Sequence, residues 1–241
     1  MGLYGAGITQ ASLYAVSWLQ SLGAVISPPE EAKEILLDIP SLRDDGHLRS
    51  GEPVEEALER FPAGAIFYGG NLSLPRKTVD FLEDPFYLAK NAAITADCAL
   101  ELAGPEIRRQ WFDLPVLVIG WGRIGKCLAA KLKTLECDVT VAARKAQDRA
   151  MLSALGYHTE DIQHLSQSVP HFRVIFNTVP APVLTEYALG RNPGCLKMDL
   201  ASVRGLEGPG VVWARGLPGK YAPEASGKLI AETYLRKERP T

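Results

Sequence analysis

Residues 116–144 constrain the fold of this chain more than any other stretch. The apolar residues 116–119 are long enough for one buried strand, and they lead directly into a G-x-G-x-x-G turn. After the turn, apolar side chains recur at the spacing of one helical face, and the β-branched residues 139–141 follow. A strand, a glycine turn, a helix and a second strand within about 30 residues predict a βαβ unit that binds a dinucleotide.

The turn consists of Gly120, Trp121, Gly122, Arg123, Ile124 and Gly125. In such a turn the first glycine permits the sharp bend and the second lets the backbone approach a pyrophosphate. The third glycine lets the helix pack closely on the sheet. The helix that follows offers free N–H groups and a partial positive charge to the phosphates. A glycine turn without a ligand is the alternative interpretation.

The end of the second strand favours NADP as the cofactor. NAD sites usually place Asp or Glu here, where the carboxylate accepts from the ribose 2′-hydroxyl. This chain has no acidic residue from 139 to 147 and carries Arg144 and Lys145 instead. A guanidinium pairs with a 2′-phosphate, which a carboxylate would repel. NAD is the alternative cofactor, and a solvated basic pair is the alternative role for the two residues.

Composition excludes several other classes of protein. The 241 residues suit one large domain or two small ones, and 46% hydrophobic with 22% charged residues is typical of a soluble globular protein. A net charge of −2 gives no reason to expect nucleic acid or a membrane as partner, and no run of 18 apolar residues predicts a transmembrane helix. The apolar start lacks the basic residues of a signal peptide. We therefore expect a cytoplasmic protein.

The four cysteines indicate neither disulfides nor a metal site. They are scattered along the chain without a C-x-x-C pair, at Cys98, Cys127, Cys137 and Cys195. Such cysteines are typical of reduced, buried thiols in the cytoplasm, so no metal is expected.

Strand and helix patterns alternate along the whole chain, which predicts an α/β fold with two domains. Residues 1–90 form a small N-terminal α/β domain, with a stunted first strand and further strands at 24–27, 35–39 and 65–68. A helix at 91–102, within a connection over 91–104, crosses a cleft between the domains. Residues 105–222 form a Rossmann-type domain with a doubly wound parallel sheet. Residues 223–241 form a C-terminal helix that returns toward the first domain.

Within the Rossmann-type domain we expect these elements after residue 144: helices at 146–155 and 160–166, a weak strand near 156–158, and strands at 172–176, 196–200 and 211–214. Ligands of such sheets bind at the carboxyl ends of the strands. The residues at those ends join the glycine turn as candidate cofactor contacts: Asn177, Thr178, Val179, Pro180 and Ala201. Asn177 and Thr178 are predicted to hydrogen-bond the nicotinamide ribose or carboxamide, with ordinary turn chemistry as the alternative. Residues 69–70 and 217–220 are expected at the same edge.

A set of motifs in this order carries a family resemblance: residues 120–126, 139–145, 177–180, 199–202 and 216–219, with Ala222 and Pro223. The set resembles the A chain of dipicolinate synthase, a relative of the NAD(P)-binding D-2-hydroxyacid dehydrogenases, over residues 91–237. The resemblance implies nicotinamide-dependent oxidation of a dihydrodipicolinate-type intermediate to pyridine-2,6-dicarboxylate during sporulation. It also implies the second, flavoprotein-like chain of dipicolinate synthase as partner, and we expect a homo-oligomer.

Two departures from that family concern the substrate site. The family carries an Asp and an Arg where this chain has Gly7 and Thr9, so no substrate role is carried over to those positions. The family's Ala-Ser-x-Pro-Gly-Gly stands here as residues 201–206, with Arg204 in place of the proline. The loop beside the nicotinamide is therefore expected to differ in shape.

A dicarboxylate substrate requires cations in the cleft. Lys220 and Arg204 are the candidates for its carboxylates, with solvated charges as the alternative, and Thr95 and Ser202 are candidate hydrogen-bond donors on opposite walls. No acid/base residue is identified, so the catalytic residues stay unknown.

Two other functions remain open. An NADP-linked 2-hydroxyacid dehydrogenase needs an acid/base, usually a histidine, near the last strand. All four histidines, His47, His158, His164 and His171, precede residue 172, which disfavours that chemistry. A non-catalytic cofactor-binding sensor or assembly protein is the second alternative.

Overall fold

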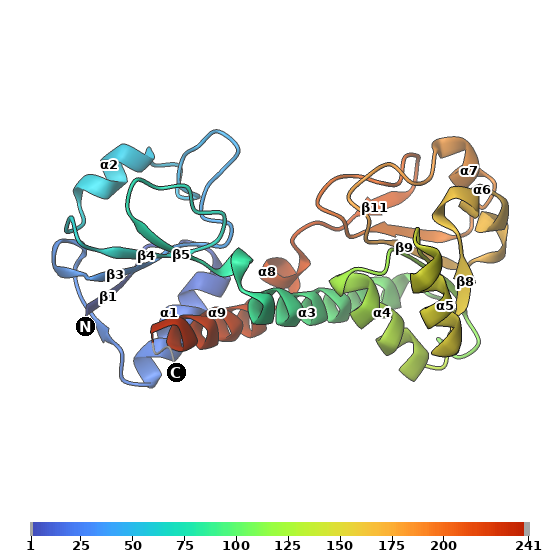
Figure 1. Ribbon diagram of the computed structural model, residues 1–241, viewed down its shortest axis with the longest axis horizontal. Coiled ribbons are helices and arrows are strands. Elements are labelled where there is room, and N and C mark those ends of the chain that lie inside the picture. The colour runs from blue at the N-terminus through green and yellow to red at the C-terminus, as the bar shows by residue number, and fades with distance from the viewer. Residues whose placement is uncertain (1, 239–241) are drawn as a thin grey trace. The chain divides into compact units, whose positions relative to one another are not determined.

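The computed structural model describes residues 2–238, and the chain forms two compact units, each built around one parallel sheet (Figure 1). The first unit comprises residues 1–94 and 218–241, and the second comprises residues 95–217. Met1 and residues 239–241, the end of the predicted C-terminal segment, lie outside the described residues. The predicted fold class, two α/β domains with a Rossmann-type doubly wound sheet in one of them, is confirmed.

The first unit has a five-stranded sheet in the order β2-β1-β3-β4-β5. Its strands are β1 (Gly2–Gly5), β2 (Val25–Ile26), β3 (Glu34–Leu36), β4 (Ile66–Gly69) and β5 (Lys77–Asp80). Its helices are α1 (Gln10–Ser21), α2 (Val54–Glu59) and α9 (Pro223–Glu238), with 3₁₀ turns at Pro29–Glu31 and Phe81–Glu83. The order reverses between β1 and β3, which is where ligands of doubly wound sheets bind.

Side chains of β3 point alternately to the two faces of the sheet, and each face carries its own cluster of buried residues. Leu36 faces the cluster that α1 and α9 form, whereas Ile35 belongs to a second cluster with Leu58 and Phe61 around α2. Both faces of the sheet are therefore covered, as buried parallel strands require. Helices α1 and α9 lie side by side on one of these faces (Figure 1).

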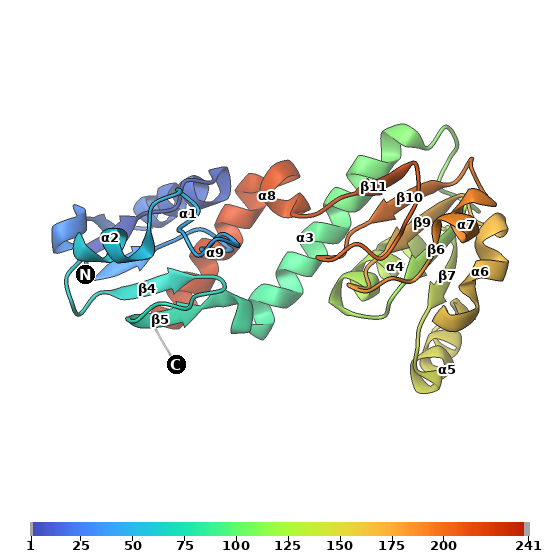
Figure 2. The ribbon, with the colours of Figure 1, turned by 90° about the horizontal axis from the view of Figure 1, so that it is seen from above.

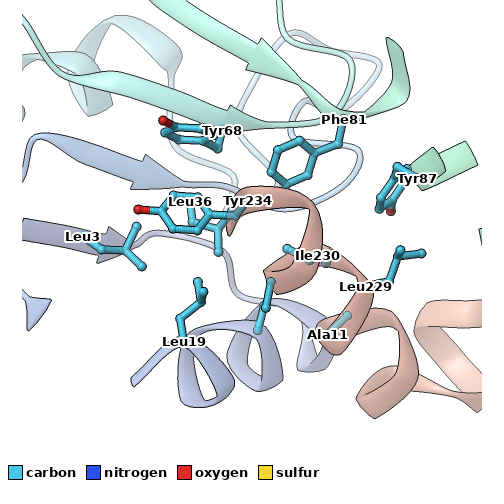
Figure 3. Close-up of a cluster of buried hydrophobic side chains, with 12 residues drawn as sticks. Leu3, Ala11, Leu19, Leu36, Tyr68, Phe81, Tyr87, Leu229, Ile230 and Tyr234 are labelled. Atoms are coloured by element: carbon cyan, nitrogen blue, oxygen red, sulfur yellow. The ribbon is translucent and has the colours of Figure 1, made fainter. Parts of the chain in front are cut away.

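A buried carboxylate ties α9 to the sheet. Glu34 accepts hydrogen bonds from the hydroxyls of Tyr68 (3.0 Å) and Tyr234 (2.7 Å). The two tyrosine rings meet edge to face with centroids 4.9 Å apart, beside Leu3 and Leu36 (Figure 3). Tyr234 lies 200 residues after Glu34, so this contact fixes the C-terminal helix in the first unit.

The second unit has a six-stranded sheet in the order β11-β10-β9-β6-β7-β8. Figure 2 labels β6, β7, β9, β10 and β11 of this sheet. Its strands are β6 (Pro115–Ile119), β7 (Asp138–Ala142), β8 (His158–Glu160), β9 (Val174–Asn177), β10 (Leu196–Asp199) and β11 (Val211–Trp213). Its helices are α4 (Arg123–Thr134), α5 (Ala146–Ala154), α6 (Leu165–Ser168) and α7 (Glu186–Gly190), with 3₁₀ turns at Gly104–Glu106, Ile162–His164 and Val169–His171. This is the Rossmann strand order, and it reverses between β6 and β9.

Helices α3 (Pro85–Ala103) and α8 (Leu217–Tyr221) have residues in both units. Within the second unit, Leu117 and Ile119 of β6 pack with Leu165 of α6 and Leu189 of α7. Helix α4 buries Leu128, Ala129 and Leu132 and contacts β6 and β7.

Several element boundaries differ from the predicted ones. Helix α3 begins at Pro85, six residues before the predicted start, because Asp84 accepts from the N–H of Tyr87 (2.8 Å) in its first turn. Strand β1 has four residues and is not stunted. Strand β5 is absent from the sequence prediction, since its half-buried residues carry no apolar run. The weak strand expected near residues 156–158 is β8 at 158–160, so Glu160, the predicted first residue of a helix, ends a strand instead, and residues 217–221 form α8.

Candidate cofactor site

The glycine turn lies between β6 and α4, at the point where the strand order of the second unit reverses. Gly120 has φ of 104°, and a side chain there would meet Thr178 Oγ1 (2.5 Å) and Val179 Cγ2 (2.9 Å). A Cβ on Gly125 would collide with the carbonyl oxygen of Gly120. These two positions therefore require glycine for steric reasons that need no ligand.

Gly122 differs from the other two glycines. Nothing lies within 4 Å of the place where its Cβ would be, and its φ of −80° is open to any residue. Its bare backbone faces open space at the N-terminus of α4, and no side chain caps that helix. The first N–H groups of α4 thus have no partner within the helix. This is the cradle that a pyrophosphate would fill.

Trp121 and Arg123 flank this cradle. Trp121 contacts Tyr157 edge-on with ring centroids 6.0 Å apart, and the ammonium of Lys126 lies 5.7 Å from its ring. Arg123 is exposed, and Ile124 is half-buried. Trp121 is also half-buried.

Arg144 and Lys145 are exposed in the loop between β7 and α5. Arg149 holds this loop in place, because its guanidinium donates to the carbonyls of Ala143 and Arg144, both at 2.8 Å. The same guanidinium pairs with Asp161 at 2.9 Å. No motif points to this role, since the two acceptors are backbone carbonyls.

The pairing of β8 with β7 brings acidic residues to the edge of the sheet that carries Arg144. Their place in the sequence does not reveal this. Glu160 of β8 stands in register with Ala142 of β7, and its carbonyl accepts from the N–H of Ala143 (3.1 Å). Asp161 follows it but is paired with Arg149. Arg144 and Lys145 thus lie on an edge that also carries Glu160, and the register of β8 is the signal that would have shown it.

A buried carboxylate organises the other strand ends. Asp199 is fully buried and accepts four hydrogen bonds: from Asn177 Nδ2 (2.8 Å) and the N–H groups of Ala201 (3.1 Å), Gly205 (2.6 Å) and Leu206 (2.9 Å). It therefore fixes the whole turn that follows β10. Asp199 was not among the predicted site residues.

Asn177 is also fully buried, and its amide is used within the protein. Its Nδ2 donates to Asp199 and to the carbonyl of Val179 (3.0 Å), and its Oδ1 accepts from the N–H of Val179 (3.0 Å). Thr178 Oγ1 donates to the carbonyl of Ile119 (2.9 Å). The side chains of Asn177 and Thr178 thus shape the turn from inside. Their direct contact with a nicotinamide stays a prediction that this arrangement does not favour.

The structure brings all of the predicted cofactor residues to the carboxyl ends of β6, β7, β9 and β10: residues 120–125, 144–145, 177–180 and 201. Ser202 and Arg204 are exposed in the turn after β10. The guanidinium of Arg204 lies 4.7 Å from the ring centre of Trp213, whose Nε1 donates to the carbonyl of Ala201 (3.1 Å). Stacking on an indole ring gives a guanidinium a defined position.

The remaining candidates lie elsewhere. Thr95 is buried in α3, and Lys220 is exposed on α8 and belongs to the first unit. The cleft in which they were expected to meet Ser202 stays a prediction.

The first unit has its own polar cluster at the reversal point between β1 and β3. Asp38 is buried and accepts from the N–H groups of Ile8 and Thr9, both at 3.0 Å. It also accepts from the hydroxyls of Thr9 and Ser12, both at 2.6 Å. Its carboxylate thus occupies the N-terminus of α1 from within the chain. A side chain at Gly7 would meet Ser12 Cβ (2.5 Å) and Asp38 Oδ1 (3.0 Å), which explains the glycine.

Two kinds of feature are missing from residues 2–238. No group of three or more His, Cys, Asp or Glu side chains is placed there to hold a metal ion. Among the same residues, no helix has the length and apolarity needed to cross a membrane.

No protein-family model matches the chain, and no curated protein matches it in sequence. Solved structures do share its fold. The A chain of dipicolinate synthase from Bacillus halodurans aligns over 99% of this chain and 97% of its own, with a TM-score of 0.82 and 22% identity. The same protein from Bacillus subtilis aligns over 98% and 94%, with a TM-score of 0.79 and 22% identity. A transhydrogenase from Sinorhizobium meliloti aligns over 99% and 94%, with a TM-score of 0.73 and 17% identity. The chain therefore shares the fold of these dipicolinate synthase structures over nearly its whole length.

Proposed function

We propose that this chain is an NADP-dependent oxidoreductase of the dipicolinate synthase type. The observation that carries the proposal is the open backbone of Gly122 at the uncapped N-terminus of α4, at the reversal point of a Rossmann sheet. Dinucleotides bind at this point of such sheets.

The residues present fit an NADP molecule. The N–H groups at the start of α4 would hold the pyrophosphate, and Arg144 with Lys145 would hold a 2′-phosphate at the end of β7. Arg149 would keep their loop in position. When bound, the nicotinamide supplies the hydride chemistry, and the protein orients the substrate against it.

For the substrate we propose a dihydrodipicolinate-type dicarboxylate, oxidised to pyridine-2,6-dicarboxylate in sporulation. The fold shared with dipicolinate synthase supports this choice. Arg204, positioned on Trp213, and Lys220 would bind the carboxylates, and Ser202 and Thr95 would donate hydrogen bonds. The flavoprotein-like second chain of dipicolinate synthase as partner, a homo-oligomeric state and a cytoplasmic location belong to the same proposal.

Two alternatives would use the same cofactor loop. One is an NADP-linked 2-hydroxyacid dehydrogenase, and the other is a non-catalytic sensor or assembly protein. Hydride transfer measured with and without a flavoprotein partner separates them. NADPH formation with the dihydropyridine supports the proposal, turnover of a 2-hydroxyacid supports the first alternative, and cofactor binding without any turnover supports the second.

Calorimetric titration of the protein with NADPH and with NADH tests the cofactor. A charge-assisted pair contributes about 1.5–3 kcal/mol, so we expect NADPH to bind about 10- to 150-fold more tightly than NADH. Arg144→Ala should remove most of this difference, while Arg49→Ala, an exposed arginine of the first unit, should not change it. Equal affinities in the wild type would contradict the proposed preference. If NADH binds better and Glu160→Gln removes that advantage, Glu160 acts as the ribose acceptor instead.

The substrate cations are tested separately. Replacing Arg204 or Lys220 by Met should weaken binding of the dicarboxylate by about 1.5–3 kcal/mol and leave NADPH affinity unchanged. Unchanged dicarboxylate binding in both variants would show that the two side chains are only solvated.

A further inference from the structure

A hollow lies in the Rossmann-type unit, at the opposite edge of the sheet from the glycine turn. Its walls come from the amino ends of four strands, at Leu114, Arg173, Leu196 and Gly210, and from residues 106–109. Strand β6 has five residues, so the two edges are about 16 Å apart. The hollow is therefore separate from the candidate cofactor site.

Positive charge is concentrated in this hollow. Arg108, Arg109 and Arg173 line it, and Glu106 is the one acidic residue among the lining residues. Within residues 2–238, no ion pair or side-chain hydrogen bond holds any of the three guanidiniums. The whole chain has a net charge of −2, so this local excess is not a property of the composition.

A buried lysine adds a further positive charge beside the wall of the hollow. The ammonium of Lys197 donates to the carbonyl of Cys195 (3.2 Å), and Cys195 lines the hollow. Burial raises the pKa of the Cys195 thiol to about 11, although the charges of Lys197 and Arg173 act in the opposite direction. The positive charges of Lys197 and Arg173 thus act on Cys195, a residue in the wall of the hollow.

The size and the lining indicate a small molecule. The hollow has a volume of about 400 Å³, within the range of small-ligand sites. Apolar side chains share its wall with the arginines, namely Ile107, Leu114, Val174, Pro193 and Leu196. Guanidiniums bind phosphate and carboxylate groups with two parallel hydrogen bonds each.

We propose that this hollow binds a small polyanionic molecule, with phosphate or carboxylate groups held by Arg108, Arg109 and Arg173 beside the apolar side chains of its wall. The site lies at the amino edge of the sheet and is independent of the cofactor loop. It does not rest on the proposed oxidoreductase function.

Calorimetric titration of the full chain with pyrophosphate and with tricarballylate at constant ionic strength tests the proposal. The Gly122→Asp variant is used beside the wild type, because a carboxylate at that open position keeps anions from the cofactor loop. We expect one binding site in Gly122→Asp. Tighter binding of pyrophosphate would identify a phosphate-bearing ligand, and tighter binding of tricarballylate a carboxylate-bearing one.

Matched charge variants locate the site. Arg108→Gln/Arg109→Gln and Arg173→Gln should each weaken binding about tenfold or more. Arg49→Gln/Lys77→Gln removes two exposed charges of the first unit and should leave binding unchanged. Thermal unfolding checks that each variant folds, and single Arg108→Gln and Arg109→Gln variants replace the double variant if it does not. Failure of both probes to bind at millimolar concentration, or equal weakening in the control, would overturn the proposal.

Discussion

Asn177 and Asp199 meet in the interior of the Rossmann-type unit, with Asn177 Nδ2 donating to Asp199 Oδ1 at 2.8 Å. The two residues end neighbouring strands, β9 and β10, and stand in register with each other. Each then holds the turn that follows its own strand: Asn177 through Val179, and Asp199 through Ala201, Gly205 and Leu206. One buried contact thus sets the shape of two of the loops at the candidate cofactor site.

Replacing Asp199 by Asn should destabilise the protein and weaken cofactor binding together. Each carboxylate oxygen accepts two donors, so an amide nitrogen in place of either oxygen leaves two buried N–H groups without an acceptor. An unsatisfied buried donor costs about 1–3 kcal/mol. Urea unfolding should show a loss of at least this size, and NADPH affinity should fall. A variant with wild-type stability would contradict the role assigned to this carboxylate.

Two glycines of the same turn should respond in opposite ways to substitution. Gly122 faces open space with an ordinary φ, at the N-cap of α4, where Asp is a preferred residue. Gly122→Asp should therefore fold with unchanged or slightly higher stability but lose NADPH binding through repulsion of the pyrophosphate.

Gly125→Ala is the matched variant. Its Cβ would collide with the Gly120 carbonyl, so overpacking should cost about 1–3 kcal/mol in the free energy of unfolding. Thermal unfolding and NADPH titration of both variants measure the contrast. Strong NADPH binding by Gly122→Asp would show that the pyrophosphate lies elsewhere.

The glycine turn was predictable from sequence because its constraints are local. Gly120, Gly122 and Gly125 act within six residues, between a strand and a helix that their own periodicity reveals. The Rossmann order of the second unit followed from the same βαβ unit, and it places residues 177–180 beside the turn.

The residues that sequence analysis missed act over longer distances. Asp38, in the segment after β3, caps α1 from 29 residues beyond Thr9, and Asp199 reaches Asn177 across 22 residues. Both contacts depend on which strands are neighbours, which no single motif reveals. The burial of Asn177 at the end of β9, where its amide binds Asp199 and the backbone of Val179, is likewise visible only once the strands are paired. Arg149 could not be identified because it binds backbone carbonyls, which are alike in every residue.

Arg149→Met should reduce the preference for NADPH although Arg149 is not proposed to touch the cofactor. Its guanidinium holds the carbonyls of Ala143 and Arg144, so its loss frees the loop that carries Arg144. We expect the ratio of NADPH to NADH affinity to fall severalfold, while NADH affinity changes little.

The Asp161→Asn variant separates two roles of Arg149, its ion pair with Asp161 and its hold on the backbone of the loop. It removes the negative charge that pairs with Arg149 at 2.9 Å but leaves both carbonyl contacts, so the ratio should change less than in Arg149→Met. An unchanged ratio in Arg149→Met would show that the loop keeps its position without this contact.

Asp84 should make the stability of the first unit depend on pH in the acid range. Burial alone would raise the pKa of this carboxyl, but the N–H of Tyr87 and the charges of Lys237 and Arg236 hold the pKa below its ordinary value. Arg236 lies at 2.8 Å and Lys237 at 3.0 Å, so the carboxylate ties the start of α3 to α9. A carboxyl whose pKa is lower in the folded state stabilises the protein above its unfolded pKa of about 3.9.

Asp84→Asn should therefore cost about 1–3 kcal/mol near neutral pH, the scale of charge-assisted hydrogen bonds. This cost should be constant down to about pH 5 and should shrink as the pH falls through the pKa of Asp84 in the folded protein, because the wild type then loses the same interaction. Urea unfolding of both proteins between pH 3 and 7 measures the difference. Asp45→Asn is the control, since Asp45 also has a lowered pKa but lies exposed beside His47, and its loss should change stability little. A cost for Asp84→Asn that does not vary with pH would show that the carboxylate charge contributes nothing to the stability of this unit.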